Sequence, residues 1–367
     1  MQIDFANLQH QHNLYKDEIE NAILKVARDC NFIMGSQIDE LERDLEKFTG
    51  SKYAISCSSG TDALLLAMMA LDIQPDDEII TTPFTFFATA ETIAFLKAKP
   101  VFVDIDEKTY NIDPSKIEEK ITPKTKAIIP VSLYGQPADM DEINQIAKKY
   151  NLKVIVDGAQ SFGSTYKGIS DSNLGDISCT SFFPAKPLGC YGDGGALFTN
   201  DEKLADKIKS LRLHGQSIRY HHQYIGMGGR LDTIQAAVLN VKLKYYEKDL
   251  KLRQDVAVKY TKALNAKNIE TPFVKNDRTS AWAQYSIRVQ NRTELQTKLQ
   301  NLGIPTAVHY PMPLHVQECF KYLNLKEGDF PISEKVSKEI MSLPMNPYVS
   351  DEEIEFIVEN LAKELRC

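Results

Sequence analysis

The most informative segment of the sequence runs Ser181-Phe182-Phe183-Pro184-Ala185-Lys186-Pro187-Leu188-Gly189-Cys190-Tyr191-Gly192-Asp193-Gly194-Gly195-Ala196. Its lysine, Lys186, stands between a short aromatic run and a loop rich in glycine, a poor setting for a side chain that is only to be solvated. A lysine kept desolvated there loses its proton more easily and becomes a nucleophilic amine that can form a Schiff base. The alternative is a surface lysine in a glycine-rich turn, which is common in loops.

A second segment, Val154-Ile155-Val156-Asp157, places an acid directly after a β-branched run that is typical of a fully buried strand. A carboxylate at such a strand end needs a cation or several hydrogen-bond donors, because burying it unpaired is costly. A protonated pyridine nitrogen is one cation that fits, and an Asp paired with it makes pyridoxal phosphate a strong electron sink. In this interpretation Lys186 holds the aldehyde of that cofactor. The alternative is that Asp157 caps the N-terminus of a helix.

A third segment, Ser58-Ser59-Gly60-Thr61-Asp62, precedes a run of Ala, Leu and Met that predicts a helix. The backbone N–H groups of Gly60 and Thr61 would then lie at the positive end of this helix, where a phosphate binds well. An ordinary N-cap followed by a buried helix has the same appearance. The segment alone therefore leaves both interpretations open.

The overall composition limits the classes of partner. The chain has 367 residues, 43% of them hydrophobic, and a formal net charge of −7. This length suits one large and one small domain, and the absence of a basic excess argues against nucleic acid as a partner. No apolar run reaches the roughly eighteen residues of a membrane span, and the mixed N-terminus does not resemble a signal peptide.

The cysteines and histidines suggest no metal. The six cysteines are scattered without zinc-binding spacing, and His214, His221 and His222 have no carboxylate partner at ligand spacing. We therefore expect no metal site, and a reducing, cytoplasmic compartment.

From Lys52 to about Asn200 the chain alternates short β-branched runs with helical patterns. The expected strands are 53–56, 78–81, 99–103, 125–130, 153–156, 179–182 and 196–199. This alternation predicts a mostly parallel sheet covered by helices on both faces, with the polar motifs at the strand ends, where ligands collect. Helices are also expected before the sheet, at 13–29 and at 36–48, the second capped by Ser36.

A long helix at about 232–264 is expected to connect a large domain, residues 1–250, with a small domain, residues 251–367. In the small domain we expect a strand at 282–289, a helix at 292–302 and a turn at 303–306 into another strand. Closing helices are expected at 333–341 and at 350–365, the last capped by Ser350. The proline-rich segment 308–315 cannot be a regular helix.

Taken in order, Ser-Ser-Gly-Thr, Asp157 with Gln160, and Ser181 with Lys186 resemble the fold-type I pyridoxal-phosphate enzymes. More narrowly, they resemble the nucleotide-sugar aminotransferases of the DegT/DnrJ/EryC1/StrS family, over nearly the whole chain. The resemblance implies an α/β fold of the aspartate aminotransferase type. Its large domain would hold a mostly parallel seven-stranded sheet, and a smaller α+β domain would follow at the C-terminus.

The resemblance assigns cofactor binding to seven residues: Gly60, Thr61, Phe86, Asp157, Gln160, Ser181 and Lys186. Among them Lys186, the catalytic residue, would hold the cofactor as a Schiff base, and Asp157 would pair with the pyridine nitrogen. Gln160 would contact the ring hydroxyl or ring face, Phe86 would stack on the other face, and the other three would bind the phosphate.

The same resemblance indicates substrate contacts. Arg230 would grip an anionic part of the substrate, and His309 and Tyr310 would line the sugar-nucleotide pocket. Alternatively, segment 308–315 only packs as an ordered loop on the small domain. The sequence departs from the family pattern at Gly228, where relatives have an Asn that reaches the cofactor phosphate of the neighbouring subunit. The effect of this departure on cofactor retention stays open.

The implied activity is transfer of an amino group from L-glutamate to a keto sugar nucleotide through pyridoxamine phosphate, with ping-pong kinetics, in a homodimer with active sites at the subunit interface. The motif around Lys186, with Arg230 and the His309-Tyr310 pair, is most similar to enzymes that aminate C3 of a UDP-2-acetamido-2-deoxy-3-keto-hexuronic acid. That reaction serves surface polysaccharide, including lipopolysaccharide O-antigen, or glycan biosynthesis.

Other activities stay open. Amination of C3 or C4 of a TDP- or UDP-linked keto-6-deoxy sugar is the nearest alternative. A pyridoxal-phosphate-dependent sugar dehydratase or lyase, and a cofactor-binding regulator, are more distant ones. Lys186 argues against the dehydratase variant, which carries a His at that position. The sequence fixes neither the nucleotide nor the sugar carbon.

Overall fold

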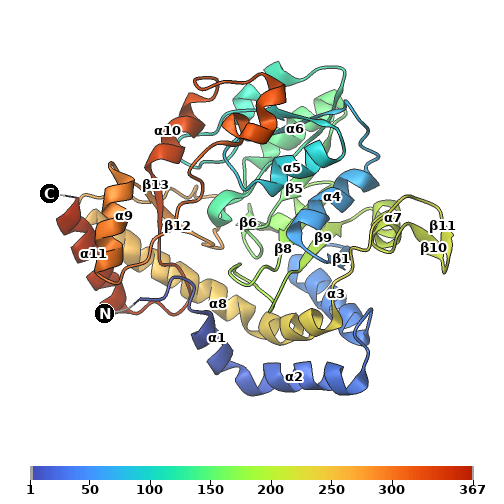
Figure 1. Ribbon diagram of the computed structural model, residues 1–367, viewed down its shortest axis with the longest axis horizontal. Helices are drawn as coiled ribbons and strands as arrows, with labels where there is room; N and C mark the ends of the chain where they lie inside the picture. Colours follow the sequence, from blue (N-terminus) through green and yellow to red (C-terminus); the bar gives the residue numbers. More distant parts are fainter. Residues whose placement is uncertain (1–2, 366–367) are drawn as a thin grey trace.

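The computed structural model describes residues 3–365, which are built around a seven-stranded sheet (Figure 1). Across the sheet the strands follow the order β1-β9-β8-β5-β4-β2-β3. Neighbours from β3 to β8 run parallel, whereas β9 is antiparallel to both β8 and β1. The predicted, mostly parallel sheet is confirmed. Its strands are β1 (Tyr53–Cys57), β2 (Glu78–Thr81), β3 (Lys99–Phe102), β4 (Thr125–Ile128), β5 (Lys153–Asp157), β8 (Ile177–Ser181) and β9 (Gly195–Thr199).

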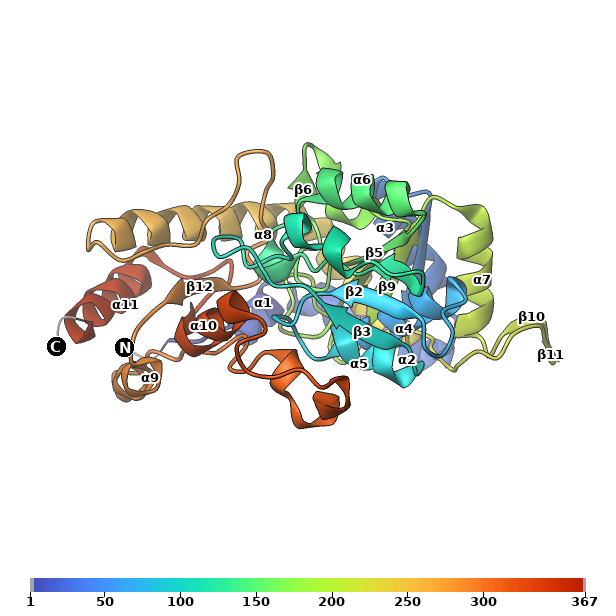
Figure 2. The same ribbon diagram turned by 90° about the horizontal axis from the view of Figure 1, so that it is seen from above.

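Helices cover both faces of the sheet, as Figures 1 and 2 show. The α-helices are α1 (Leu8–Leu14), α2 (Lys16–Asp29), α3 (Ser36–Thr49), α4 (Gly60–Ala70), α5 (Ala88–Phe95), α6 (Met140–Tyr150), α7 (Glu202–Arg212), α8 (Thr233–Asn265), α9 (Arg292–Asn301), α10 (Pro331–Glu339) and α11 (Asp351–Glu364). The short 3-10 helices are η1 (Pro114–Lys116), η2 (Glu118–Lys120), η3 (Leu133–Gly135), η4 (Asp171–Asn173), η5 (Leu314–Val316) and η6 (Glu318–Leu323).

The continuous apolar runs of the central strands reflect burial on both sides. Successive side chains of a strand point to opposite faces. Ile79 and Ile155 therefore pack with α4, α5 and α7. Their neighbours Ile80 and Val154 pack with α6 on the other face. On that second face, α3 and the first half of α8 cover β1 and β9.

The C-terminal part has its own apolar cluster. Strands β12 (Tyr285–Arg288) and β13 (Ile340–Leu343) pair antiparallel and pack with α9, α11 and the second half of α8. Ile3 belongs to the same cluster, and its N–H donates to the carbonyl of Gly303 (3.1 Å). The domain boundary expected at residue 250 lies inside α8 and stays a prediction. Two pairs of short strands complete the described sheets: β6 (Thr165–Tyr166) with β7 (Ile169–Ser170), and β10 (Gln216–Ile218) with β11 (His221–His222).

Some element boundaries differ from the expectation. The helix expected at 13–29 is interrupted at Tyr15, whose ring stacks on Tyr245 of α8 (centroids 4.1 Å apart). Helix α3 does begin at Ser36, but its N-cap is Gly35 and no side chain caps it. Asp157 ends strand β5 and is not a helix cap. Tertiary contacts, which local sequence does not carry, decide each of these cases.

The end of the chain brings two further corrections. The helix expected at 333–341 stops at Glu339, because Ile340–Leu343 pairs with β12. The strand expected after the turn at 303–306 is reduced to one isolated bridge between Ala307 and Ser342. The cap at Ser350 is confirmed as a full capping box with Glu353. Within residues 3–365 no helix combines the length and the apolar character that crossing a membrane requires.

Candidate active site

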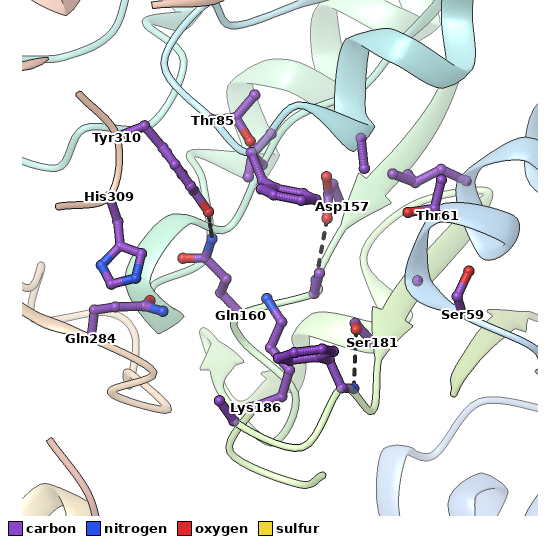
Figure 3. Close-up of a pocket in the computed structure, with 18 of the residues that line it drawn as sticks. Ser59, Thr61, Thr85, Asp157, Gln160, Ser181, Lys186, Gln284, His309 and Tyr310 are labelled. Carbon is purple, nitrogen blue, oxygen red and sulfur yellow. Dashed lines mark hydrogen bonds between the residues drawn. The ribbon is translucent and has the colours of Figure 1, made fainter. Parts of the chain in front are cut away.

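A cavity of about 480 Å³ lies where the carboxyl ends of the central strands meet the C-terminal part of the chain. The loops after β2, β5 and β8 and the first turn of α4 line it, together with Gln284 and the segment 309–310 (Figure 3). Ligands of open α/β sheets bind at this edge. The residues that the sequence predicted and that the structure brings together here are Gly60, Thr61, Phe86, Asp157, Gln160, Ser181, Lys186, His309 and Tyr310.

Lys186 lies in a tightly held loop after β8. Phe182 and Leu188 are buried on either side of it, and the Lys186 N–H donates to the carbonyl of Phe183 (2.8 Å). Only glycine fits at position 189, because a Cβ there would lie 2.4 Å from the carbonyl oxygen of Pro184. The Nζ of Lys242 in α8 donates to the Gly189 carbonyl (2.7 Å). The loop therefore presents Lys186 from a fixed backbone.

The amine of Lys186 has no hydrogen-bond or ion-pair partner among residues 3–365 (Figure 3). Desolvation lowers its pKa below the ordinary lysine value, and the negative charge of Asp157 opposes this shift only in part. A lowered pKa leaves more of the amine neutral at physiological pH, which is the form that attacks a carbonyl carbon. This setting suits the nucleophile that the sequence predicted, and the catalytic role of Lys186 stays a prediction.

Asp157 occupies the end of β5 and is 5% exposed. Its Oδ2 accepts from Thr89 Oγ1 (2.7 Å) and its Oδ1 from the N–H of Ala159 (3.2 Å). Burial raises its pKa, while these two donors and the amine of Lys186 act against that rise. Two neutral donors leave part of the cost of burying a carboxylate uncompensated. A cationic ligand atom would complete the pairing.

Both the oxygen and the nitrogen of the Gln160 side-chain amide make hydrogen bonds within the protein. Its Oε1 accepts from the N–H of Tyr134 (2.7 Å), and its Nε2 donates to the hydroxyl of Tyr310 (3.0 Å). Figure 3 shows this link between the turn after β5 and the segment of His309 and Tyr310. The hydroxyl of Tyr134 donates to the carbonyl of His309. Gln160 therefore couples the sheet edge to the C-terminal wall of the cavity.

Two further predicted residues face the cavity without a full set of protein contacts. Phe86 is 54% exposed although it lines a cavity, so one face of its ring is available to a flat ligand. The Nδ1 of His309 bonds to Ser342 Oγ (2.8 Å). Burial, with a smaller contribution from the charge of Lys186, lowers the pKa of His309 to about 4. The imidazole is therefore neutral at pH 7.

The opposite side of the cavity suits an anion. Helix α4 begins at Gly60, and the Oγ of its N-cap Ser59 accepts from the N–H of Asp62 (3.0 Å). Gly60 has no room for a side chain, because a Cβ there would lie 2.6 Å from the Cβ of Ser181. The N–H groups of the first turn, with the hydroxyls of Thr61 and Ser181 beside them, are hydrogen-bond donors of the kind that bind a phosphate, and this role stays a prediction.

These residues fit pyridoxal phosphate. An anion site, an unpaired amine and an incompletely paired buried carboxylate line one cavity, and a ring of Phe86 is exposed to it. They match the phosphate, the aldehyde, the pyridine nitrogen and the ring face of the cofactor. The roles of the individual residues stay predictions.

One predicted substrate residue lies elsewhere. Arg230 does not line the cavity; it follows Gly229, whose N–H donates to the carbonyl of Arg212 (3.0 Å). Gly228 is exposed, and a Cβ there would lie 3.0 Å from the ring of His214. His221 and His222 form β11, in a hairpin at the opposite end of the molecule from α9 and α11 (Figure 1).

Sequence reasoning missed several residues of this site. Thr89 lies in the first turn of α5, and its hydroxyl bonds to that of Thr85 in the loop before the helix (3.0 Å), a contact that no local pattern marks. Ser59 was recognisable as an N-cap. Nothing in the local sequence marked Gln284 or Ser342, which reach the cavity or its wall only through the tertiary fold.

Comparisons with known proteins agree with this geometry. The model of the "DegT/DnrJ/EryC1/StrS aminotransferase family" matches residues 13–362. A Pseudomonas aeruginosa protein named UDP-2-acetamido-2-deoxy-3-oxo-D-glucuronate aminotransferase is 51% identical, over 97% of this chain and 98% of its own. A Geobacillus stearothermophilus protein named pleiotropic regulatory protein is 44% identical, over 99% and 98%. The crystal structure of ntda from Bacillus subtilis with bound cofactor PMP superposes with a TM-score of 0.92 at 32% identity, covering 100% of this chain and 86% of that one.

Proposed function

The chain belongs to the DegT/DnrJ/EryC1/StrS aminotransferase family, and from this premise we propose that it transfers an amino group from L-glutamate to C3 of a UDP-2-acetamido-2-deoxy-3-keto-hexuronic acid. The choice of sugar is supported by the name of the Pseudomonas aeruginosa relative. The product would serve the biosynthesis of a surface polysaccharide, such as an O-antigen, or of a glycan.

The observation that carries the reaction is the unpaired amine of Lys186 in the same cavity as the buried carboxylate of Asp157. Pyridoxal phosphate, when bound, supplies an aldehyde that takes up the amino group and a ring that withdraws electrons from the reacting carbon. Asp157 would keep the proton on the ring nitrogen, because Lys186 is the only cation among residues 3–365 that acts on its buried carboxylate. Phe86 would cover one ring face, and the start of α4 would hold the phosphate.

In this proposal Lys186 also transfers a proton. Its side chain lines the cavity from a fixed loop and would be placed to move a proton at the reacting carbon. With a lowered pKa, this amine accepts a proton from the substrate carbon in one half of the reaction and returns it in the other. Tyr310 and Gln160, bonded to one another, orient the wall against which the sugar lies.

We also propose that the protein acts as a homodimer. Apolar side chains are exposed in two separate loops, namely Phe32, Ile33 and Met34 before α3, and Ile218 and Ile225 around the hairpin β10–β11. Covering such surfaces favours association. Arg230 does not line the cavity of its own chain, and in this proposal it contacts substrate in the cavity of a second copy. Sedimentation would test this assembly, and a monomer would contradict it.

The cellular setting stays a prediction. Five cysteines within residues 3–365 are free thiols, and three of them are buried. Free thiols are usual in a reducing compartment such as the cytoplasm.

The absorbance spectrum tests the proposed reaction directly. Purified wild type and Lys186→Ala are compared before and after L-glutamate, and then with a panel of UDP- and TDP-linked keto sugars. We expect a band of lysine-bound cofactor in the wild type only, which glutamate converts to the pyridoxamine form. The 3-keto-hexuronic acid should restore it.

Two results would overturn parts of the proposal. If no lysine-bound band forms even with added pyridoxal phosphate, the assignment of Lys186 fails. If only a keto-6-deoxy sugar restores the band, the reaction class stands and the sugar is wrong.

A further inference from the structure

Gln284 lines the cavity with an amide that has no partner. It precedes β12, and among residues 3–365 no group donates to its Oε1, which is buried. Its Nε2 makes no hydrogen bond to the described residues either. A buried amide oxygen without a hydrogen bond is unfavourable, and native proteins rarely leave one unless a water or a ligand completes it. Gln284 therefore has both a donor and an acceptor to offer.

The backbone holds Gln284 in place. The N–H of Ala283 donates to the carbonyl of Tyr134 (3.1 Å), and Tyr285 is fully buried and paired with Leu343 in the β12–β13 ladder. The residue is thus fixed on both sides, so its amide is presented from a rigid strand end. Preorganised groups of this kind lose little entropy on binding.

Its surroundings restrict the kind of ligand group. Figure 3 places Gln284 beside His309, on the side of the cavity away from Ser59 and Thr61. His309 is neutral at pH 7, and Lys186 is the one cationic side chain among the described residues that line the cavity. This part of the wall therefore presents neutral hydrogen-bonding groups.

A comparison with Gln160 further restricts the chemical group that Gln284 can bind. Both ends of the Gln160 amide are bonded within the protein, to the N–H of Tyr134 and to the hydroxyl of Tyr310. Gln284 can only be satisfied from outside. A carboxylate would accept from its Nε2 and leave Oε1 unpaired, and an ammonium group would do the reverse. A secondary amide offers an N–H and a C=O together and satisfies both.

We propose that Gln284 is a specificity-determining residue that binds the N-acyl group of an N-acylated amino sugar, with Oε1 accepting from the N–H and Nε2 donating to the C=O. This inference rests on the proposed function and adds the contact by which an acetamido sugar is distinguished from a sugar without an amide. In this proposal the amino acid that donates the amino group does not contact Gln284.

Equilibrium binding tests the inference without catalysis. UDP-N-acetylglucosamine and UDP-glucose, which differ in the acetamido group at C2, are titrated into the pyridoxamine form of the wild type, Gln284→Leu and Gln284→Glu. We expect the wild type to prefer the N-acetyl compound by roughly 10- to 100-fold, the range that one unpaired buried amide implies. Both variants should reduce this preference to less than about threefold.

The matched control is Gln296→Leu. This glutamine lies in α9 outside the cavity, and its Nε2 donates to Thr306 Oγ1 (3.0 Å). The variant should keep the wild-type preference. Gln284→Glu has the size of the native side chain but lacks the donor, so it reports on recognition even if Gln284→Leu does not fold.

A second measurement separates Gln284 from the amino donor. The rates of the glutamate and keto-sugar half-reactions are followed separately by absorbance, and Gln284→Leu should lower the sugar rate at least tenfold more than the glutamate rate. Equal losses in both would overturn the inference, and so would an unchanged preference for the N-acetyl nucleotide. If the wild type binds that nucleotide preferentially but aminates no acetamido keto sugar, the proposed function fails while the assignment of Gln284 stands.

Discussion

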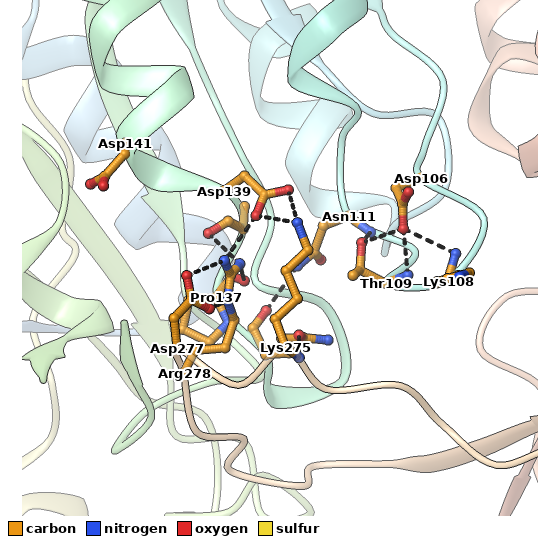
Figure 4. A network of polar contacts seen from close by, with 12 residues as sticks. Asp106, Lys108, Thr109, Asn111, Pro137, Asp139, Asp141, Lys275, Asp277 and Arg278 are labelled. Carbon is orange, nitrogen blue, oxygen red and sulfur yellow. Dashed lines mark hydrogen bonds and ion pairs between the residues drawn. The ribbon is translucent and has the colours of Figure 1, made fainter. Parts of the chain in front are cut away.

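The cavity and the polar network around Arg278 differ in whether their charged side chains are paired within the protein. In the network, Arg278 is 8% exposed and donates to the carbonyls of Pro137 (2.8 Å) and Ala138 (3.0 Å) and to the carboxylates of Asp139 (2.8 Å) and Asp277 (2.7 Å) (Figure 4). Lys275 adds two bonds to Asp139, of 2.7 and 2.8 Å.

The cavity leaves comparable groups open. The amine of Lys186 and the amide of Gln284 have no partner within residues 3–365, and Asp157 is bonded only to neutral donors. A buried charge stabilises only when it is paired, and otherwise its burial is a cost. The charged groups of the network are thus paired within the protein, whereas those of the cavity are not, as we expect if the cavity groups bind ligands.

The largest effect is expected from Lys186→Ala. Removing the amine takes away both the cofactor link and the proton carrier, so amino transfer should fall roughly 10³- to 10⁴-fold. The stability of the folded chain should change little, because the amine has no protein partner to lose. Transfer rate and urea unfolding are measured together, with the exposed Lys244→Ala as the control. A rate above about a tenth of wild type would contradict the role of Lys186.

Arg278→Ala should show the reverse pattern. It leaves the carboxylate of Asp277 and two carbonyls without their donor, and we expect a loss of about 3 kcal/mol in the free energy of unfolding. The folded fraction should still bind cofactor with a wild-type spectrum. Arg43→Ala, an exposed arginine, serves as the control and should stay within about 0.5 kcal/mol. A loss of cofactor binding without a loss of stability would contradict the prediction that Arg278 serves the stability of the fold and not ligand binding.

The pKa of Asp171 is affected by one charged group from each region, Asp157 of the cavity and Arg278 of the network. Asp171 is 1% exposed and accepts from Ser132 Oγ (2.9 Å) and from Ser161 Oγ. Burial raises its pKa to about 6, the charge of Asp157 adds to the rise, and Arg278 opposes it. Because the folded pKa exceeds the unfolded one, the stabilising contribution is present below about pH 4 and is lost as the pH rises through 6.

Asp171→Asn removes this titration. The stability of the variant relative to wild type should therefore rise by about 2 kcal/mol between pH 4 and pH 7. Urea unfolding at a series of pH values measures the difference. Parallel stability curves for the two proteins would show that Asp171 keeps its ordinary pKa in the fold.

The smallest effect is expected at the solvent-exposed capping box of α11. Ser350 Oγ accepts from the N–H of Glu353 (3.2 Å), and the Glu353 carboxylate accepts from the N–H of Ser350 (2.8 Å), both on the exposed start of α11. Ser350→Ala should cost about 1 kcal/mol in urea unfolding. Ser350→Asp should recover most of the loss, and an equal loss in both variants would point away from capping.

Much of the sheet was predictable because its signal is local. Runs such as Val154-Ile155-Val156 are apolar on both faces, which marks a strand buried between helix layers. The same runs end in the polar residues of the site, so the positions of Asp157 and Lys186 at one sheet edge followed from the predicted topology. The antiparallel direction of β9 was not marked, because pairing direction is set by the crossover and not by composition.

The remaining differences come from long-range contacts. The strand Ile340–Leu343 exists only through its pairing with β12, and the break at Tyr15 accompanies its stacking on Tyr245. Gln284 reaches the cavity from another part of the chain, and its neighbours in sequence give no hint of a ligand. The predicted contact of Arg230 with substrate stays a prediction, because Arg230 does not line the cavity and no local pattern tells whether its own chain or another copy receives it.

The packing of Ile3 has a consequence for the order of assembly. The other members of its cluster begin at Val256, and its N–H bonds to Gly303. Since a ribosome releases the chain from its N-terminus, the segment around Ile3 emerges long before any of these partners exists. The sheet that carries Asp157 and Lys186 can form during that interval, whereas the wall with Gln284 and His309 is completed only after synthesis reaches the last helix. The order of synthesis therefore allows the sheet edge with Asp157 and Lys186 to form before the wall with Gln284 and His309.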